Sequence, residues 1–509
     1  MSKQLFKSTL VVSSMTLISR LLGFVRDTLI AQLFGVDIAT DAFFVAFKIP
    51  NFLRRLFAEG AFAHAFVPVL ATYKEQGHAP LKQFIAKVAG TLSLCLLLLS
   101  VLGIVTAPLL IFALAPGFAW QGSAHDIAVL SLQIMLPFLF FISLTALCGS
   151  VLNAHQRFAI PAITPVFLNL TMIWAALYLA PTLETPVLAL AWAVLLAGVI
   201  QLVFQLPSLW RLSLLSMPRI AFDDTGVKKV IGLMIPAIFS VSVTQINLLL
   251  DTLIASLLKS GSVSWLYYSD RLVEFPLGIL GLALGTVILP HLSKHHAQEN
   301  HENFSHSLDW GLRLVLVVGL PATIGLIMLA EPMLFTLFQY KEFNVQDVYL
   351  SGQSLKAYAV GLIGYLMIKV LVPAFTSRQD VKTPVRYGAY AMGISLALNV
   401  LAIPLAHVGL ALATSLGAFF NAALLLKKLF KAKVYRPVQG WFIFSLRVVF
   451  ANAIMAGMIY YAVDSDAWQP WTASERLWHL VLWISAAIVV YVVALLSTGL
   501  KLKALLNPT

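Results

Sequence analysis

The chain has 509 residues, of which 60% are hydrophobic and only 11% are charged, whereas an ordinary soluble protein has roughly 45–50% and roughly 25%. This composition excludes a soluble globular enzyme, even one with a single membrane anchor, and it also excludes a disordered or fibrous chain. The net charge is +12, but the basic residues are scattered through short segments without an aromatic-flanked basic stripe, so nucleic acid is not an expected partner. The composition predicts a polytopic membrane protein.

Apolar segments of about 20 residues or more, the length a helix needs to cross a bilayer core, recur along the whole chain. They lack the ten-residue alternation of a β-barrel, so we expect an all-α fold. The first apolar run is interrupted by Arg20 and Arg26, so it is expected to remain as a helix and not to be a cleaved signal peptide. We predict about fourteen transmembrane helices: 8–34, 41–72, 86–112, 127–153, 159–180, 186–209, 230–257, 264–291, 312–338, 348–375, 384–404, 407–427, 440–462 and 477–500.

The distribution of Lys and Arg outside these helices predicts the orientation. Both termini and the even-numbered loops hold 22 of these residues, whereas the odd-numbered loops hold only Lys259, Lys341 and Arg476. Because short cytoplasmic loops carry an excess of positive charge, both termini are expected in the cytoplasm.

Two halves of the chain resemble each other at a spacing of 222 residues. Residues 188–191 and 410–413 both read Leu-Ala-Leu-Ala, and Pro68 has a counterpart in Pro290. Several matches at one spacing indicate a duplication. Each repeat holds six helices, so the repeats enter from the same side and are related by an axis along the membrane normal. We predict two six-helix lobes in a parallel pseudo-twofold repeat, followed by two extra helices, with the bounds 1–225, 226–436 and 437–509.

The first two predicted helices and the eighth carry many ionisable residues. Such a residue costs about 2.5–3.5 kcal/mol at the centre of a membrane helix, so it usually faces a partner or a water-filled cavity. The positions that lie 222 residues after the arginines of the first half hold serine, leucine and proline. These cations therefore do not belong to the scaffold that the two repeats share. The residues are Arg20, Arg26, Asp27, Asp41, Lys48, Arg54, Arg55, Glu59, Asp270, Arg271 and Glu274.

The arginines predict a site for phosphate or pyrophosphate, because a guanidinium is always charged and its planar donor fork fits phosphate oxygens. The hypothesis is a water-filled cavity between the halves, where the anion is held by Arg20, Arg26, Arg54 and Arg271. Acidic residues would pair with these cations when the site is empty, which limits the cost of unpaired charge: Asp27, Glu59, Asp270 and Glu274. Three others would support or gate the site: Asp41, Lys48 and Arg55. For any single arginine the alternative is a side chain that reaches an interface or a fixed ion pair.

Other candidate chemistry is weaker. Asp251 and Asn247 could bind an ion or a proton, although an interhelical hydrogen bond is the alternative, and the role of Lys369 stays open. Histidines between 291 and 306 are typical of a polar loop, so no metal site is expected. The chain has no Walker, GxSxG or HExxH motif, so no catalytic residue and no cofactor are expected. Transport would then use the membrane potential, an ion gradient or the substrate's own gradient.

Several stretches resemble a known family. Residues 19–27 read SRLLGFVRD, residues 39–51 read ATDAFFVAFKIPN, residues 261–276 read GSVSWLYYSDRLVEFP and residues 377–384 read SRQDVKTP. These motifs resemble the MviN/MurJ family of lipid II flippases, and the resemblance runs essentially from end to end.

The resemblance implies the fold of the multidrug/oligosaccharidyl-lipid/polysaccharide exporter superfamily. It also implies a non-enzymatic function, the transfer of lipid II, an undecaprenyl-pyrophosphate-linked peptidoglycan precursor, across the bacterial inner membrane by alternating access. The family's critical cavity arginines map onto Arg20, Arg26, Arg54 and Arg271, and the two extra helices correspond to a groove for the lipid tail. Expected partners are lipid II, membrane lipids and the cell-wall synthesis machinery.

Three other functions stay open from the residues themselves. A flippase for another polyprenyl-linked oligosaccharide would need the same cationic site. A drug or cation exporter would need an acidic or aromatic pocket, which an arginine-rich site does not provide. A membrane glycosyltransferase would normally show an acidic metal-binding motif or a large domain outside the membrane.

Overall fold

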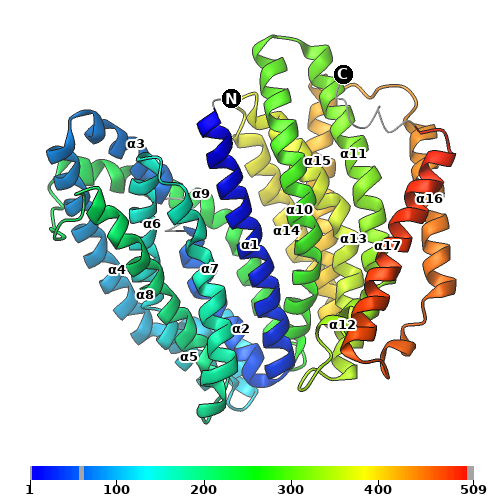
Figure 1. Cartoon of the computed structure of the whole chain (residues 1–509), viewed down its shortest axis with the longest axis horizontal. Helices are drawn as coiled ribbons and strands as arrows, with labels where there is room; N and C mark the ends of the chain where they lie inside the picture. Colours follow the sequence, from blue (N-terminus) through cyan, green and yellow to red (C-terminus); the bar gives the residue numbers. More distant parts are fainter. Residues whose placement is uncertain (1–2, 57–61, 501–509) are drawn as a thin grey trace. The chain divides into compact units, whose positions relative to one another are not determined.

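The computed structural model describes residues 3–56 and 62–500, and these residues are almost entirely helical, with no strand among them. The predicted all-α fold is therefore confirmed. Contacts divide the chain into two compact units, Met1–Ser264 and Trp265–Thr509. Figure 1 follows the helices by colour along the chain. In the first unit they are α1 Lys3–Phe34, α2 Ile38–Arg54, α3 Phe62–Glu75, α4 His78–Leu114, α5 Ala124–Met135, α6 Phe138–Ala154, α7 Ala159–Trp174, α8 Leu188–Arg211 and α9 Thr225–Ser256.

The remaining helices begin with α10, whose first residues belong to the first unit and whose main part belongs to the second. Within the described residues, ten helical segments are long and apolar enough to cross a membrane. The exact count of fourteen stays a prediction. The helices are α10 Ser262–Ala297, α11 His301–Met328, α12 Ala330–Leu337, α13 Val345–Thr376, α14 Lys382–Leu401, α15 Ala406–Lys431, α16 Trp441–Ala462 and α17 Ala473–Ser497.

The bounds of the helices repeat at the spacing found in the sequence. A shift of α1 by 222 positions gives 225–256, which are the bounds of α9. The same shift takes the end of α3 to residue 297, where α10 ends, and the end of α6 to residue 376, where α13 ends. The backbone therefore carries the duplication that short sequence matches indicated.

The first unit is built on pairs of helices that are distant in sequence. Helix α1 packs on α7, α2 on α5, and α6 on α8. An aromatic stack joins α3 to α4, with ring centroids 5.7 Å apart for Phe66 and Phe84 and 4.2 Å apart for Tyr73 and Phe84. Offset aromatic pairs add about 0.5–1.5 kcal/mol beyond the burial of their surface, so this stack fixes the two helices.

Helix α9 packs on α3 and α4, although the sequence places it at the start of the second repeat. Its N-cap is Asp224, whose side chain accepts hydrogen bonds from the backbone N–H groups of Gly226 and Val227 and pairs with Lys87 on α4. A Cβ atom at Gly226 would lie 2.6 Å from the hydroxyl of Tyr73, so only glycine allows this approach. The beginning of α9 is therefore anchored to the first unit.

Replacing Asp224 by alanine is expected to lower the free energy of unfolding by about 1–2 kcal/mol at pH 7, because the first turn of α9 loses its cap. Burial acts to raise the pKa of the Asp224 carboxyl, but the hydrogen bonds from Lys87, Val227 and Gly226 outweigh it and hold the pKa below its usual 3.8. The ionised carboxylate therefore stabilises the fold fully at pH values above 3.8, the usual pKa that holds in the unfolded chain. This contribution is lost as the pH falls through the pKa of the folded state, which lies below 3.8. Unfolding of D224A and the wild-type chain across pH 3–7 tests this, and an equal difference at every pH would contradict it.

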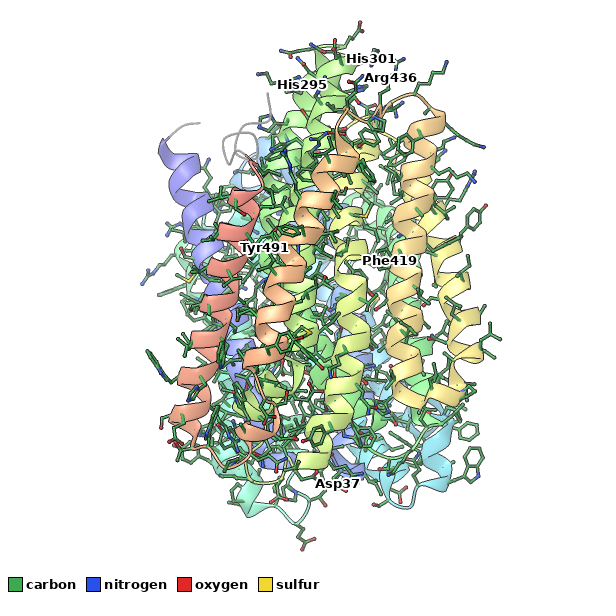
Figure 2. All side chains as sticks on the ribbon, turned by 90° about the vertical axis from the view of Figure 1, so that its right-hand side faces the viewer. Asp37, His295, His301, Phe419, Arg436 and Tyr491 are labelled. Carbon is green, nitrogen blue, oxygen red and sulfur yellow. The ribbon has the colours of Figure 1, made fainter. Side chains whose placement is uncertain are left out.

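In the second unit, α13 packs against α11, α12 and α15, and α14 packs mainly on α15. The hairpin of α16 and α17 covers α11 through an apolar cluster that includes Val317, Val448 and Tyr491. The Tyr491 hydroxyl donates to the Val317 carbonyl at 2.7 Å. Figure 2 shows Tyr491 along α17, and it shows His295, His301 and Arg436 together at one end of this unit.

The segment before α16 is fixed to α11 by the buried Asp309. One carboxylate oxygen accepts from the Tyr435 hydroxyl at 2.8 Å, the Val438 backbone N–H at 3.1 Å and the Trp441 indole at 2.6 Å. The other oxygen accepts from Arg313 at 2.8 Å. Burial and the bond to Asp309 raise the pKa of Tyr435 well above its usual range, so the hydroxyl stays a donor. The start of the terminal hairpin is thus tied to the second unit.

Candidate functional site

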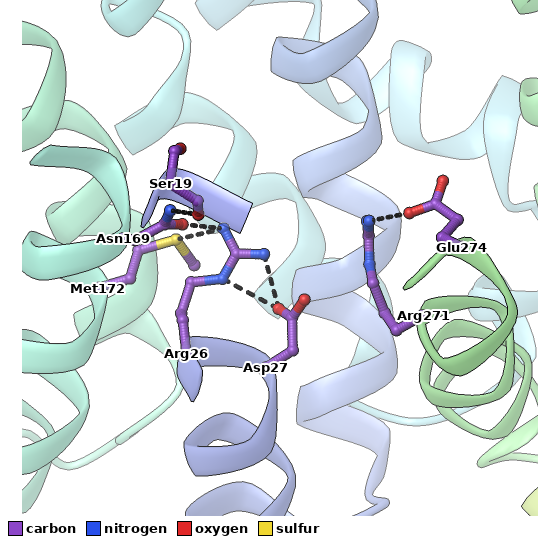
Figure 3. Close-up of polar contacts among 7 residues, drawn as sticks. All are labelled: Ser19, Arg26, Asp27, Asn169, Met172, Arg271 and Glu274. Atoms are coloured by element: carbon purple, nitrogen blue, oxygen red, sulfur yellow. Dashed lines mark hydrogen bonds and ion pairs between the residues drawn. The ribbon is translucent and has the colours of Figure 1, made fainter. Parts of the chain in front are cut away.

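Helix α1 carries a buried ion pair, Arg26 and Asp27, inside the helical bundle of the first unit. Arg26 and Asp27 are only 8% and 3% exposed. Nε and Nη2 of Arg26 donate to the same oxygen of Asp27, at 2.9 and 2.6 Å (Figure 3). On α7, the side chain of Asn169 accepts from Nη1 of Arg26 at 3.0 Å. A buried charge needs such partners, because its desolvation costs several kcal/mol.

Arg20 lies on the same helix but is exposed, whereas Arg26 is buried. The two side chains are six residues apart and therefore point about 120° away from each other on a straight helix. This difference in direction matches the difference in burial. Arg20 is the more accessible of the two cations.

Lys48 and Arg54 of α2 are half-buried. Lys48 donates to the hydroxyl of Thr252 on α9 at 2.6 Å, which joins the two helices. Arg54 is the last residue of α2, and its Nε donates to Asn51 at 3.4 Å. Arg55 follows it and is also half-buried, and Glu59 lies outside the described residues.

Asp41 is buried at the first turn of α2 and ties it to the segment that begins α10. Its carboxylate accepts from the backbone N–H groups of Gly261 at 2.7 Å and Ser264 at 2.8 Å. The Ser264 hydroxyl donates to it as well. The backbone N–H groups at the start of a helix have no carbonyl acceptor within the helix. The Asp41 carboxylate supplies the acceptor for these two groups at the start of α10. Asp41 therefore acts as a connection between helices in this structure.

The second unit holds the remaining predicted cation. Arg271 on α10 pairs with Glu274 one turn later (Figure 3). The Cζ of Arg271 lies 4.8 Å from the centroid of the Tyr267 ring. Both side chains of this pair are partly exposed, at 31% and 45%. Asp270 is half-buried beside Arg271. The pair is therefore far more open than the Arg26 pair.

The candidate ion site stays a prediction. Asp251 is half-buried on α9, next to Thr252, and the side chain of Asn247 lies outside the described residues. In the second unit, Lys369 of α13 runs along Gly281 of α10, where an added Cβ would lie 3.4 Å from its Cγ. In the described part of the chain, no three His, Cys, Asp or Glu side chains gather as metal ligands do.

The sequence analysis missed several partners of the predicted cations, among them Asn169, Thr252 and Tyr267. Tyr267 stands four residues before Arg271, a spacing at which helical side chains meet, so it could have been found. Asn169 is a single side-chain amide within an apolar segment. Burying an amide without a hydrogen bond costs free energy, so the sequence could have predicted that Asn169 has a polar partner. Which charge it meets depends on the packing of α1 on α7.

The fold is shared with solved structures. A structure titled "Inward-facing conformation of a multidrug resistance MATE family transporter of the MOP superfamily" matches with a TM-score of 0.68 at 15% identity, over 84% of this chain and 98% of that chain. The chain therefore shares the fold of that transporter. A structure titled "Lipid II flippase MurJ, inward closed conformation" matches with a TM-score of 0.80 at 26% identity, over 95% of this chain and 98% of that chain.

The sequence comparisons narrow the class to one family. The family model described as "Lipid II flippase MurJ" matches residues 30–482. A "Probable lipid II flippase MurJ" of Vibrio cholerae serotype O1 is 45% identical, over 99% of this chain and 98% of that protein. The "Lipid II flippase MurJ" of Burkholderia cenocepacia is 43% identical over 91% of each. The chain belongs to the lipid II flippase MurJ family, as its motifs predicted, and it is a multi-pass membrane transporter, not an enzyme.

Proposed function

We propose that this chain moves lipid II from the cytoplasmic to the periplasmic leaflet of the bacterial inner membrane by alternating access. Family membership supports this substrate, and the buried pair of Arg26 and Asp27 is the structural observation that carries the proposal. A lipid-linked, pyrophosphate-bearing headgroup cannot enter hydrocarbon unaided, because burying its charge and polar groups without partners is too costly. The protein must therefore supply cations inside the membrane.

The geometry of Arg26 suits exchange between a carboxylate and a phosphate. Asp27 occupies the Nε–Nη2 edge of the guanidinium, which is the edge that binds phosphate in two-point fashion. In the empty protein Asp27 limits the cost of the buried cation, and a phosphate oxygen takes its place when substrate binds. The same exchange applies to Arg271 and Glu274 in the second unit.

The remaining parts of the proposal follow the predicted architecture. Arg20, Arg26 and Arg54 of the first lobe and Arg271 of the second would converge on the pyrophosphate, and the lobes 1–225 and 226–436 would rock about it. Residues 437–509 would offer the lipid tail its groove, and both termini would be cytoplasmic. The membrane potential or an ion gradient would drive the cycle, and Asp251 and Asn247 would form the ion site. The cell-wall synthesis machinery would then use the lipid II delivered to the periplasmic leaflet.

The test is the leaflet accessibility of labelled lipid II in proteoliposomes, with and without a membrane potential. The variants R20A, R26A, R54A and R271A are each expected to slow transfer roughly tenfold or more, since each loses a charge-assisted interaction. R436A, an exposed arginine in the segment before α16, is the control and should leave transfer unchanged.

Two results would overturn the proposal. One is normal lipid II transfer by folded R20A or R271A together with loss of cation export. The other is product turnover by the purified protein in detergent, where no leaflets exist, which would point to a membrane enzyme. Equal transfer of an unrelated polyprenyl-linked sugar would show that the substrate is a wider class than lipid II.

A further inference from the structure

Asn169 of α7 connects two points of α1. Its side-chain nitrogen donates to the backbone carbonyl of Ser19 at 2.9 Å, and its oxygen accepts from Nη1 of Arg26 at 3.0 Å (Figure 3). The residue is buried. A single amide therefore links the backbone of α1 to the functional cation one to two turns later.

The spacing on α1 explains how one residue can reach both groups. Ser19, Gly23 and Arg26 follow at i, i+4 and i+7, so they lie on one face of the helix. A Cβ atom added to Gly23 would lie 3.6 Å from the Asn169 amide. Asn169 therefore lies against the face of α1 between the two contacts.

The orientation of the amide follows from its partners. The Ser19 carbonyl can only accept, and the guanidinium of Arg26 can only donate. A flipped amide would set its NH₂ group against the guanidinium and its oxygen against the carbonyl, so both hydrogen bonds would be lost. The oxygen of Asn169 is therefore held toward Arg26.

The contacts of Arg26 divide between neutral and charged acceptors. At Nη1 the acceptors are Asn169 and the sulfur of Met172, at 3.0 and 3.9 Å, and both come from α7. Nε and Nη2 donate to the carboxylate of Asp27. A neutral acceptor orients the guanidinium without cancelling its charge, whereas the carboxylate competes with any anionic ligand.

We propose that Asn169 is a positioning residue for the transport reaction. Asn169 keeps its hydrogen bond to Nη1 of Arg26 and so holds the guanidinium in place. Meanwhile Nε and Nη2 exchange one acceptor, the Asp27 carboxylate, for another, a phosphate oxygen of the substrate. This inference rests on the proposed function, because it assigns Asn169 a role through Arg26. A residue that only clamped α7 to α1 would affect folding in the same way whether or not Arg26 were present.

The experiment is a double-mutant cycle on lipid II binding by the purified full-length protein in nanodiscs. N169A is expected to weaken binding about tenfold, the size of one hydrogen bond to a charged group. In the R26A background the same change is expected to have no further effect, since the group that Asn169 positions is gone. Q205A is the matched control, because Gln205 of α8 is also a buried amide that donates to α7, to the Thr164 hydroxyl at 3.0 Å, and this bond involves no predicted cation.

A second variant keeps the test informative if N169A folds poorly. N169D is nearly isosteric and keeps an acceptor beside Arg26, but it loses the donor to the Ser19 carbonyl. Its negative charge also competes with phosphate for Arg26, so binding should weaken more when Arg26 is present than in the R26A background. Equal weakening by N169A or N169D in the R26A background, or wild-type binding by both, would overturn the positioning role while leaving the proposed function intact. Wild-type binding by folded R26A would instead count against the proposed function.

Discussion

Replacing Arg26 by methionine is expected to lower the free energy of unfolding by about 3–5 kcal/mol, because the buried carboxylate of Asp27 then loses the two hydrogen bonds and the positive charge of Arg26. The pair is suited to this test, since its side chains are only 10% and 4% exposed. Water therefore solvates the remaining carboxylate only poorly. Replacing both residues, in R26M/D27L, should recover most of the loss, because no buried charge remains.

The measurement is thermal or denaturant unfolding of the three proteins in the same detergent. R271M is the matched control. The pair of Arg271 and Glu274 is 31% and 45% exposed, and exposed pairs contribute about 0–1 kcal/mol. A loss in R26M no larger than in R271M, or an equal loss in the double variant, would contradict the expectation.

The same variants separate stability from transport. Under the proposed function, R26M/D27L should be nearly as stable as the wild-type chain and still fail to transfer lipid II, because the phosphate has lost its cation. A stable and active double variant would show that the buried pair serves packing only.

The helices and their duplication could be predicted because both leave a local trace in the sequence. Apolar length determines where a helix can cross a bilayer, and the 222-residue spacing of short matches agrees with the bounds of α1 and α9. The ends were less well predicted. Helix α10 continues to Ala297, so His295 and His296 are helical. Hydropathy indicates where the apolar stretch ends, but polar residues can extend a helix beyond it.

The candidate site could be predicted only in part. Arg26 and Asp27 are adjacent, so their pairing is visible in the sequence. The bond from Arg26 to Asn169 spans 143 positions, and that from Lys48 to Thr252 spans 204. Such bonds depend on which helices pack together, and no periodicity within one helix contains that information. The capping role of Asp41 is of the same kind, since its partners lie 220 and 223 positions away.

Replacing Arg476 by alanine is expected to lower the stability of the second unit by about 3 kcal/mol or more, because several buried carbonyls lose their donor at about 1–3 kcal/mol each. Arg476 stands in the first turn of α17 and is 5% exposed. Its guanidinium donates to the carbonyls of Trp468 and Gln469 at 2.9 Å and to those of Phe335 and Gln339 at 3.0 Å. Phe335 lies in the last turn of α12, so the cation also meets the negative end of that helix.

The contacts explain why lysine should not replace this arginine. The carbonyls come from the last turn of α12, from Gln339 just after that helix and from the turn before α17, and the planar fork reaches them in different directions. A lysine ammonium is a single point with three donors on a flexible stem. The free energy of unfolding of R476K is therefore expected to lie between that of the wild-type chain and that of R476A.

Hydrogen exchange measured by mass spectrometry would locate the effect. In R476A, amides of α12 and of the first turns of α17 should exchange faster, while those around Asp309 at the other end of the hairpin should keep their protection, because that anchor is intact. R436A is the control: Arg436 is exposed, so its loss should stay within about 0.5 kcal/mol. Uniformly faster exchange along α16 and α17 would mean that the hairpin opens as one piece and that Arg476 is not a separate anchor.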